Sequence, residues 1–276
     1  MNKVLYAFLT IMAFTSCMNS YSVDGTSNMS TLDGRMLYLK VLKNNEFKKL
    51  DSCEVVHGQF HFTGPVDSVR MANIFMDDES VMPLILEDGD IKVQINDTQL
   101  TVSGTPLNDK LMKFFKKYNQ LKNDEAELVH KHDRAIMDGK DMNLVNSHLN
   151  SEATRLSEQE DHLVTSFVTE NFDNALGPGV FFLVTIGNQY PELTPWIEDI
   201  MSKATDHFKN DPYVKMYYQK AQENQQIMTG LKEPSGVTVA PQEPQTTPLP
   251  PLGAATNAVP APTPNDLAKP AEPQNK

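Results

Sequence analysis

Hydrophobic and polar positions between residues 21 and 104 follow the pattern of short strands. Phe60 and Phe62 alternate with polar neighbours, which is typical of a strand buried on one side. Gly58 suits a tight hairpin turn just before them, because glycine readily adopts a positive φ. Strands are expected at 36–41, 49–56, 59–63, 69–76, 81–86, 91–95 and 100–103, with a turn at 87–90. This series of short strands predicts an antiparallel β-sandwich or a partly open barrel.

The period changes to that of helices at Thr105-Pro106. Threonine is a favoured N-cap residue and proline is favoured at the first helical position. Apolar residues then recur at three- and four-residue steps up to Ile136. They do so again from residue 142 to 172, after the break DGKD at 138–141. The pattern predicts two long helices in an antiparallel hairpin.

Three further helices are expected after the hairpin. Residues 180–184 are apolar all round, which predicts a buried helix. Thr194-Pro195 and Asp211-Pro212 repeat the cap-then-proline pattern and predict helices at 196–208 and 213–228. The predicted fold class is therefore α+β: a β-domain, a helical domain and a tail, with boundaries at 21–104, 105–230 and 231–276.

The tail is separated from the helical domain by its composition. Eleven of the 18 prolines lie between Pro234 and Pro273, mixed with Ala, Thr, Gln and Asn. No periodic apolar face is present, so this segment cannot bury enough surface to offset the entropy of ordering it. We predict a disordered, Pro-rich tail that is partly polyproline II.

The first residues read as an export signal. Lys3 precedes an apolar run, residues 4–14, which has the length of a signal-peptide core and is too short to span a membrane. The sequence FTSC at 14–17 resembles the lipobox of bacterial lipoproteins, with Phe14 where leucine is usual. We predict a signal peptide at 1–16, lipidation of Cys17 and a short anchor at 17–20. An ordinary secretory signal with an incidental cysteine is the alternative.

The net charge of the chain narrows the classes of partner that it can bind. The chain of 276 residues has a formal net charge of −12, which argues against nucleic acid and against electrostatic adhesion to anionic lipids. The bilayer contact is therefore expected through the acyl groups on Cys17. No acidic cluster follows Cys17 directly. In similar lipoproteins of gut anaerobes such a cluster directs export to the cell surface. We therefore expect a periplasm-facing protein in the cell envelope, with the outer membrane favoured over the inner.

Cys17 and Cys53 are the two cysteines of the chain. Lipidation of Cys17 leaves Cys53 without a partner for an intramolecular disulfide. Cys53 lies in an expected strand, where a thiol packs as a small hydrophobic group. We therefore expect Cys53 to be an inert core residue.

Four short strings in the strand region carry a family resemblance. They are LDSCEV at 50–55, GQFHF at 58–62, LILEDGDI at 84–91 and SGTPLN at 103–108. Together they resemble the domain of unknown function 4369. That domain stands at the N-terminus of many lipoproteins of gut anaerobes, followed by a helical spacer and a thioredoxin-like domain of the TlpA and ResA kind.

The chain departs from that layout where the thioredoxin-like domain would begin. It has no Cys-x-x-Cys pair and no cysteine after Cys53. Dithiol exchange requires two neighbouring thiols. The resemblance therefore implies the platform of these lipoproteins without the redox domain, and we expect no thiol–disulfide oxidoreductase activity.

Other possible sites are weak. Glu127 and His130 have the Glu-x-x-His spacing of di-iron bundles, but no second copy exists and both lie off the apolar face. His57 and His61 flank one strand without a third zinc ligand. The charged run at 158–162 reads as the solvated face of a helix. We expect no catalytic residue, no metal site and no cofactor.

Three functions are compatible with the sequence. The favoured one is a membrane-anchored envelope lipoprotein with a non-catalytic binding or scaffolding role, with an envelope protein as its partner. The second is an accessory partner of a thioredoxin-like envelope oxidoreductase. The third is an enzyme such as a hydrolase, whose site the sequence does not reveal.

Overall fold

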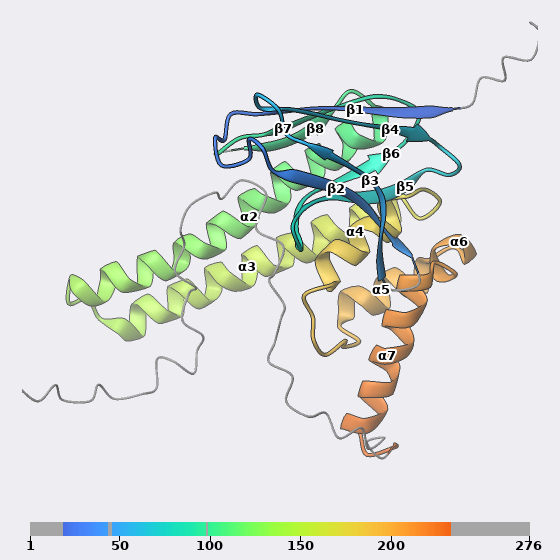
Figure 1. Ribbon diagram of the computed structural model, residues 1–276. Coiled ribbons are helices and arrows are strands. Elements are labelled where there is room, and N and C mark those ends of the chain that lie inside the picture. The colour runs from blue at the N-terminus through green and yellow to red at the C-terminus, as the bar shows by residue number, and fades with distance from the viewer. Residues whose placement is uncertain (1–18, 44–45, 98, 233–276) are drawn as a thin grey trace, which may run out of the picture.

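The protein is represented by a computed structural model that describes residues 19–43, 46–97 and 99–232. The fold is α+β, with two four-stranded sheets followed by helices (Figure 1). The predicted signal peptide, Cys17 and the predicted tail beyond Lys232 lie outside the described residues.

The two sheets contain the strands expected from the sequence and one more. One sheet has the order β4-β1-β7-β8 and the other has the order β3-β2-β5-β6. The strands are β1 (Ser20–Ser27), β2 (Met36–Lys43), β3 (Glu46–Glu54), β4 (Gln59–Pro65), β5 (Arg70–Met76), β6 (Glu79–Leu86), β7 (Gly89–Ile95) and β8 (Leu100–Ser103). The chain crosses between the sheets four times: between β1 and β2, between β3 and β4 at His57-Gly58, between β4 and β5, and between β6 and β7.

The expectation of a wholly antiparallel sandwich is wrong for one pair. β1 runs parallel to β7, with Tyr21 opposite Gly89 and Val23 opposite Ile91. The added strand β1 was not among the expected runs, because it contains few large apolar residues. Gly25 is one reason for this, since a Cβ there would lie 2.0 Å from the Phe60 ring. The position must stay small for that ring to pack across the strand.

The sheets pack face to face around a shared apolar core. Ile91, Val93 and Ile95 of β7 all point into this core, and the exposed Lys92 and Gln94 alternate with them, as expected for a sheet covered on one side. The opposing sheet contributes the inward side chains Leu37, Leu39, Val41, Ala72, Ile74, Met82 and Leu84.

β5 and β6 are buried on both faces. Ala72 and Ile74 point into the sandwich, whereas Met71 and Ile85 belong to a second core shared with the helices. This explains why the two strands read as nearly continuous apolar runs. The helices therefore cover the outer face of the sheet that contains β5 and β6 (Figure 1).

The helical domain has the predicted hairpin and one unexpected break. The helices are α2 (Pro106–Met137), α3 (Met142–Thr169), α4 (Leu176–Thr185), α5 (Pro195–Lys203), α6 (Asp206–Lys209) and α7 (Pro212–Met228). The single helix predicted for 196–208 is wrong: Ala204 is extended, with φ −64° and ψ 137°. The Thr205 hydroxyl then accepts a hydrogen bond from the Phe208 amide and starts α6. Thr205 is an N-cap signal inside an apolar pattern.

Helix α4 is the centre of the second core. It is buried along its length, as predicted, with Phe181 fully enclosed. The Phe181 ring contacts Tyr217 of α7 at 5.4 Å between centroids, and Phe182 contacts Phe47 of β3 at 6.1 Å. Helix α4 therefore joins the sheet to α7.

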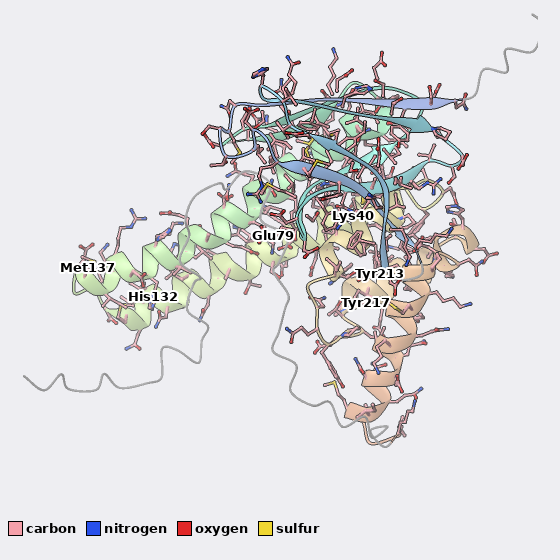
Figure 2. The ribbon with its side chains drawn as sticks, in the orientation of Figure 1. Lys40, Glu79, His132, Met137, Tyr213 and Tyr217 are labelled. Carbon is pink, nitrogen blue, oxygen red and sulfur yellow. The ribbon has the colours of Figure 1, made fainter. Side chains whose placement is uncertain are left out.

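The hairpin extends well beyond this core. Tyr118 of α2 and Leu163 of α3 still pack against it. The remaining turns of both helices project to one side of the body, and Met137 marks their far end (Figures 1 and 2). Met137 is 86% exposed.

Candidate functional site

Two of the four family strings, those at 84–91 and 103–108, meet where the end of β6 lies beside the start of α2. This contact between the β-domain and the helical domain is here called the joint. Glu87 follows β6, and its Oε1 accepts hydrogen bonds from the amides of Leu107 at 2.8 Å and Asn108 at 3.2 Å. A carboxylate at this place satisfies free amides and complements the helix dipole. Thr105 occupies the predicted N-cap position but makes no capping bond with its side chain. Glu87, 20 residues away from Leu107, performs that role.

The buried side chain of Asn108 also holds the joint together. Its Oδ1 accepts a hydrogen bond from the Ile85 amide and its Nδ2 donates to the Ile85 carbonyl, both at 2.8 Å. Nδ2 also donates to the Thr105 hydroxyl at 2.8 Å. Asn108 is fully buried. Since β6 is an edge strand, this one side chain satisfies main-chain groups that a neighbouring strand would otherwise bind.

A shallow, open depression lies beside the start of α2. Its lining residues are Gly104, Thr105, Pro106, Asp109, Lys110 and Lys113. Asp109 accepts a hydrogen bond from the Gly104 amide at 3.2 Å, and Lys110 donates to Asn171 Oδ1 at 2.8 Å. These side chains therefore support the joint, and no arrangement of nucleophile and base faces the depression.

A cluster of ion pairs lies where the hairpin leaves the body. Lys122 Nζ donates to Glu160 at 2.7 Å and to Glu125 at 3.2 Å. Burial, followed by the charge of Glu160, raises the pKa of Tyr118 to about 12. Burial alone would lower the pKa of Lys122, but its hydrogen bond to Glu160 and the neighbouring negative charge raise it overall. The cluster holds a protonated lysine between carboxylates and clamps α2 to α3.

The expectation that residues 158–162 form a solvated face is wrong for Glu160. The run at 158–162 was expected to be a solvated face, but the Glu160 side chain is only 19% exposed. Glu158 and His162 are exposed as expected. The difference arises because Lys122, 38 residues earlier, lies directly across the hairpin.

Cys53 lies on β3 and is partly buried against the sandwich core. Its strand is an edge of its sheet. Burial raises the pKa of the Cys53 thiol, which opposes formation of the reactive thiolate. Cys53 is thus less enclosed than expected, but its surroundings do not activate it.

The structure does not bring the histidine candidates together. His57 adopts φ 51° and Gly58 adopts φ 69° in the hairpin turn, whereas His61 Nδ1 lies 2.8 Å from Asp24. Glu127 pairs with Arg134, and His130 is exposed. Across residues 19–43, 46–97 and 99–232, no three His, Cys, Asp or Glu side chains are grouped closely enough to hold a metal ion.

A row of aromatic rings beneath the sheets was not recognised in the sequence. It leads from Phe75 through Phe47 and Phe182 to Tyr213, with centroid distances between 4.8 and 6.1 Å. Figure 2 shows Tyr213 and Tyr217 on α7, and Lys40 on the sheet above them. Lys40 Nζ lies 4.4 Å from the centroid of Phe75. Long-range packing alone creates this row, so no local pattern could have shown it.

One family model matches the region that contains Glu87 and Asn108. Residues 21–111 match the family model DUF4369, a domain of unknown function. The matched residues make up about a third of the chain. The match runs from Tyr21 in β1 to Leu111, so it covers the two sheets except Ser20, together with Glu87, Asn108 and the first turns of α2. The resemblance read from the four strings is confirmed for this domain.

Comparison with curated proteins returned no match. Among the described residues, no helix has both the length and the apolar character needed to cross a bilayer.

Proposed function

We propose that the protein is a lipoprotein of the cell envelope, anchored through Cys17, with a non-catalytic binding or scaffolding role. The observation that carries the proposal is the position of the first described strand. Strand β1 begins at Ser20, three residues after Cys17. Its amide is held by Asp88 at 2.8 Å. An acyl anchor on Cys17 would thus be followed almost at once by the folded body.

The N-terminal end of β1 and the far end of the hairpin lie on opposite sides of the body (Figure 1). Tyr21 pairs with Gly89, and a Cβ at Gly89 would lie 3.4 Å from Thr105, where α2 begins. Helix α2 runs from that end toward Met137 (Figure 1). Its 32 residues correspond to roughly 48 Å. A body anchored through Cys17, three residues before Ser20, would therefore present the hairpin away from its membrane, where an envelope protein can reach it.

Removal of the acyl-accepting thiol tests the anchor. The Cys17→Ala chain should leave the membrane fraction or accumulate as an unprocessed precursor, whereas Cys53→Ala should fractionate like the unchanged chain. The mature N-terminus should be an acylated Cys17 by mass spectrometry. A mature chain that begins at another residue would refute the lipoprotein proposal.

A second function is favoured by the DUF4369 match. The matched domain is the one that, in the lipoproteins this chain resembles, precedes a thioredoxin-like domain, and this chain carries only Cys53 after the predicted anchor. It would then act as an accessory partner of a separate thioredoxin-like envelope oxidoreductase. Affinity purification of the lipidated full chain from its native envelope should recover that enzyme. Recovery of envelope proteins without a thioredoxin-like oxidoreductase would support the scaffolding role and refute the accessory role.

A further inference from the structure

Three side chains that carry hydrogen-bond donors lie in one row across the sheet β3-β2-β5-β6. Lys40 of β2 is directly opposite Lys49 of β3 on one side and Asn73 of β5 on the other. Directly opposed residues share a face of the sheet. Leu39 and Val41, the neighbours of Lys40, point into the sandwich core, so the row faces outward. These three residues are here called the lysine row.

The two lysines of the row gather around one aromatic ring. Lys40 Nζ lies 5.7 Å from the centroid of Tyr38, and Lys49 Nζ lies 5.8 Å from the same centroid. Lys40 Nζ also lies 4.4 Å from the centroid of Phe75 (Figure 2 labels Lys40). Like charges directly opposite each other destabilise a strand pair. The rings attract both ammonium groups, but they carry no net charge that would neutralise them.

The carboxylates closest to the row in sequence are engaged elsewhere. Glu46 binds Lys48, whose register partner is a core residue, so this ion pair belongs to the other face of the sheet. Burial, followed by the charge of Asp51, raises the pKa of Tyr21, which lies in the sandwich core. The Asp51 carboxylate therefore acts on the sandwich side of the sheet and not on the lysine row.

Two further carboxylates flank the sheet at a distance from the row. Glu54 is opposite Met36, which lies four residues before Lys40 along β2, or about 13 Å away. Glu79 is opposite Met76, which packs against the sandwich core, so Glu79 starts from the inner face. Within residues 19–43, 46–97 and 99–232, no ion pair joins either lysine of the row to a carboxylate. The chain nevertheless has a formal net charge of −12.

Asn73 adds a buried neutral donor to the two cations. Its side chain belongs to a residue that is only 3% exposed. Its Oδ1 accepts a hydrogen bond from the Ser80 hydroxyl at 3.3 Å, and its Nδ2 has no acceptor in the described part of the chain. Buried polar groups in folded proteins normally have a hydrogen-bond partner. The lysine row thus offers two ammonium groups and one amide donor, with no acceptor facing them.

We propose that the lysine row binds an oxyanion, a phosphate or carboxylate group carried by a small ligand. Such a group accepts several charge-assisted hydrogen bonds at once and would neutralise the two opposed ammonium groups. A cation would increase the repulsion, and a neutral ligand would leave it in place. The row belongs to the folded body, so the proposal stands whether or not Cys17 is acylated.

An NMR titration of the isotope-labelled chain from Met18 to Lys276 tests the proposal. Inorganic phosphate and citrate are separate probes, and potassium chloride holds the ionic strength at about 0.15 M. The side-chain amide of Asn73 and the backbone amides of Lys40 and Lys49 should shift and reach saturation. Saturation with phosphate alone would assign a phosphate ligand, and saturation with citrate alone would assign a carboxylate ligand.

Single lysine substitutions locate the binding. Lys40→Met and Lys49→Met should each weaken binding about tenfold or more, because each removes one charge and keeps an apolar stem beside the rings. Lys48→Met is the matched control, since Lys48 lies on the same strand and already pairs with Glu46. It should leave the binding unchanged. Absence of a saturable shift with both probes, or equal weakening by Lys48→Met, would overturn the proposal.

Thermal unfolding gives a second measurement on the same chains. Phosphate stabilises proteins in general, so the comparison is between variants. The saturating probe should raise the unfolding midpoint of the unchanged chain and of Lys48→Met by more than that of Lys40→Met. Circular dichroism before heating should show that all the chains are folded. An equal rise in every chain would contradict binding at the lysine row.

Discussion

Asn108 binds the main chain of Ile85 through both ends of its amide. Its oxygen accepts from the Ile85 amide and its nitrogen donates to the Ile85 carbonyl, each at 2.8 Å. The pair joins strand β6 of the β-domain to the first turn of α2 in the helical domain. Ile85 also belongs to the core formed by the helices. The two domains are thus fixed to each other at the point where the chain passes between them.

Asn108→Ala should destabilise the protein by about 2–4 kcal/mol. The substitution leaves a buried amide and a buried carbonyl of Ile85 without their partner, and each unsatisfied group costs about 1–3 kcal/mol. Urea unfolding followed by circular dichroism measures the change. Asn123→Ala is the control, because Asn123 is exposed on the same helix. Equal effects of the two substitutions would show that the amide does not hold the joint.

The sequence predicted the elements better than their partners. Residues 59–63 and the α2–α3 hairpin were identified because local periodicity marks them. The parallel pairing of β1 with β7 escaped prediction, since it joins Tyr21 to a residue 68 positions away. The break at Ala204 was also missed. Thr205 lies inside an apolar pattern, and its capping role appears only with the backbone.

The same limit applies to the candidate sites. The four family strings indicated the similarity to DUF4369, but they did not reveal the structural role of Asn108. Its hydrogen-bond partner, Ile85, lies 23 residues earlier on a sheet edge. Glu160 was assigned to solvent because its partner Lys122 belongs to another helix. Short-range spacing records which face a residue lies on. It does not record what the fold brings against that face.

Gly177→Ala should be more damaging than Gly179→Ala. A Cβ at Gly177 would lie 2.4 Å from the main-chain oxygen of Asn171, which cannot move without shifting the end of α3. At Gly179 the nearest atom, at 2.5 Å, is the flexible methyl end of Met71. Overpacking of this kind costs about 1–3 kcal/mol. Thermal unfolding should place Gly177→Ala near the upper value and Gly179→Ala near the lower. The reverse order would mean that Met71 is held more rigidly than the backbone.

Cys53 should not support disulfide reduction. Exchange requires a thiolate and a second thiol to resolve the mixed disulfide. Burial raises the pKa of Cys53, and no other cysteine follows it in the chain. The chain from Met18 should therefore reduce insulin in dithiothreitol no faster than dithiothreitol alone, and Cys53→Ser should behave identically. Reduction that depends on Cys53 would contradict both the raised pKa of its thiol and the requirement for a second, resolving thiol.

Tyr118 should make the protein sensitive to alkaline pH. Burial and the charge of Glu160 raise its pKa to about 12 from the ordinary value of 10.0. The folded state therefore retains the phenolic proton more strongly than the unfolded chain does. This contribution to stability is complete below pH 10 and is lost as the pH rises toward 12. Between pH 9 and 11.5 the loss amounts to about 2 kcal/mol.

Tyr118→Phe isolates this effect. Phenylalanine keeps the ring that stacks on Phe114 at 5.6 Å but has no proton to lose. Urea unfolding of both chains at pH 9, 10, 11 and 11.5 should show a steeper loss of stability in the unchanged chain. Tyr21 and Tyr213, whose pKa values are also raised by burial, are present in both chains and cancel in the difference. Parallel pH profiles would show that Tyr118 ionises as freely in the folded protein as in the unfolded chain, and that the clamp beside Lys122 is open to water.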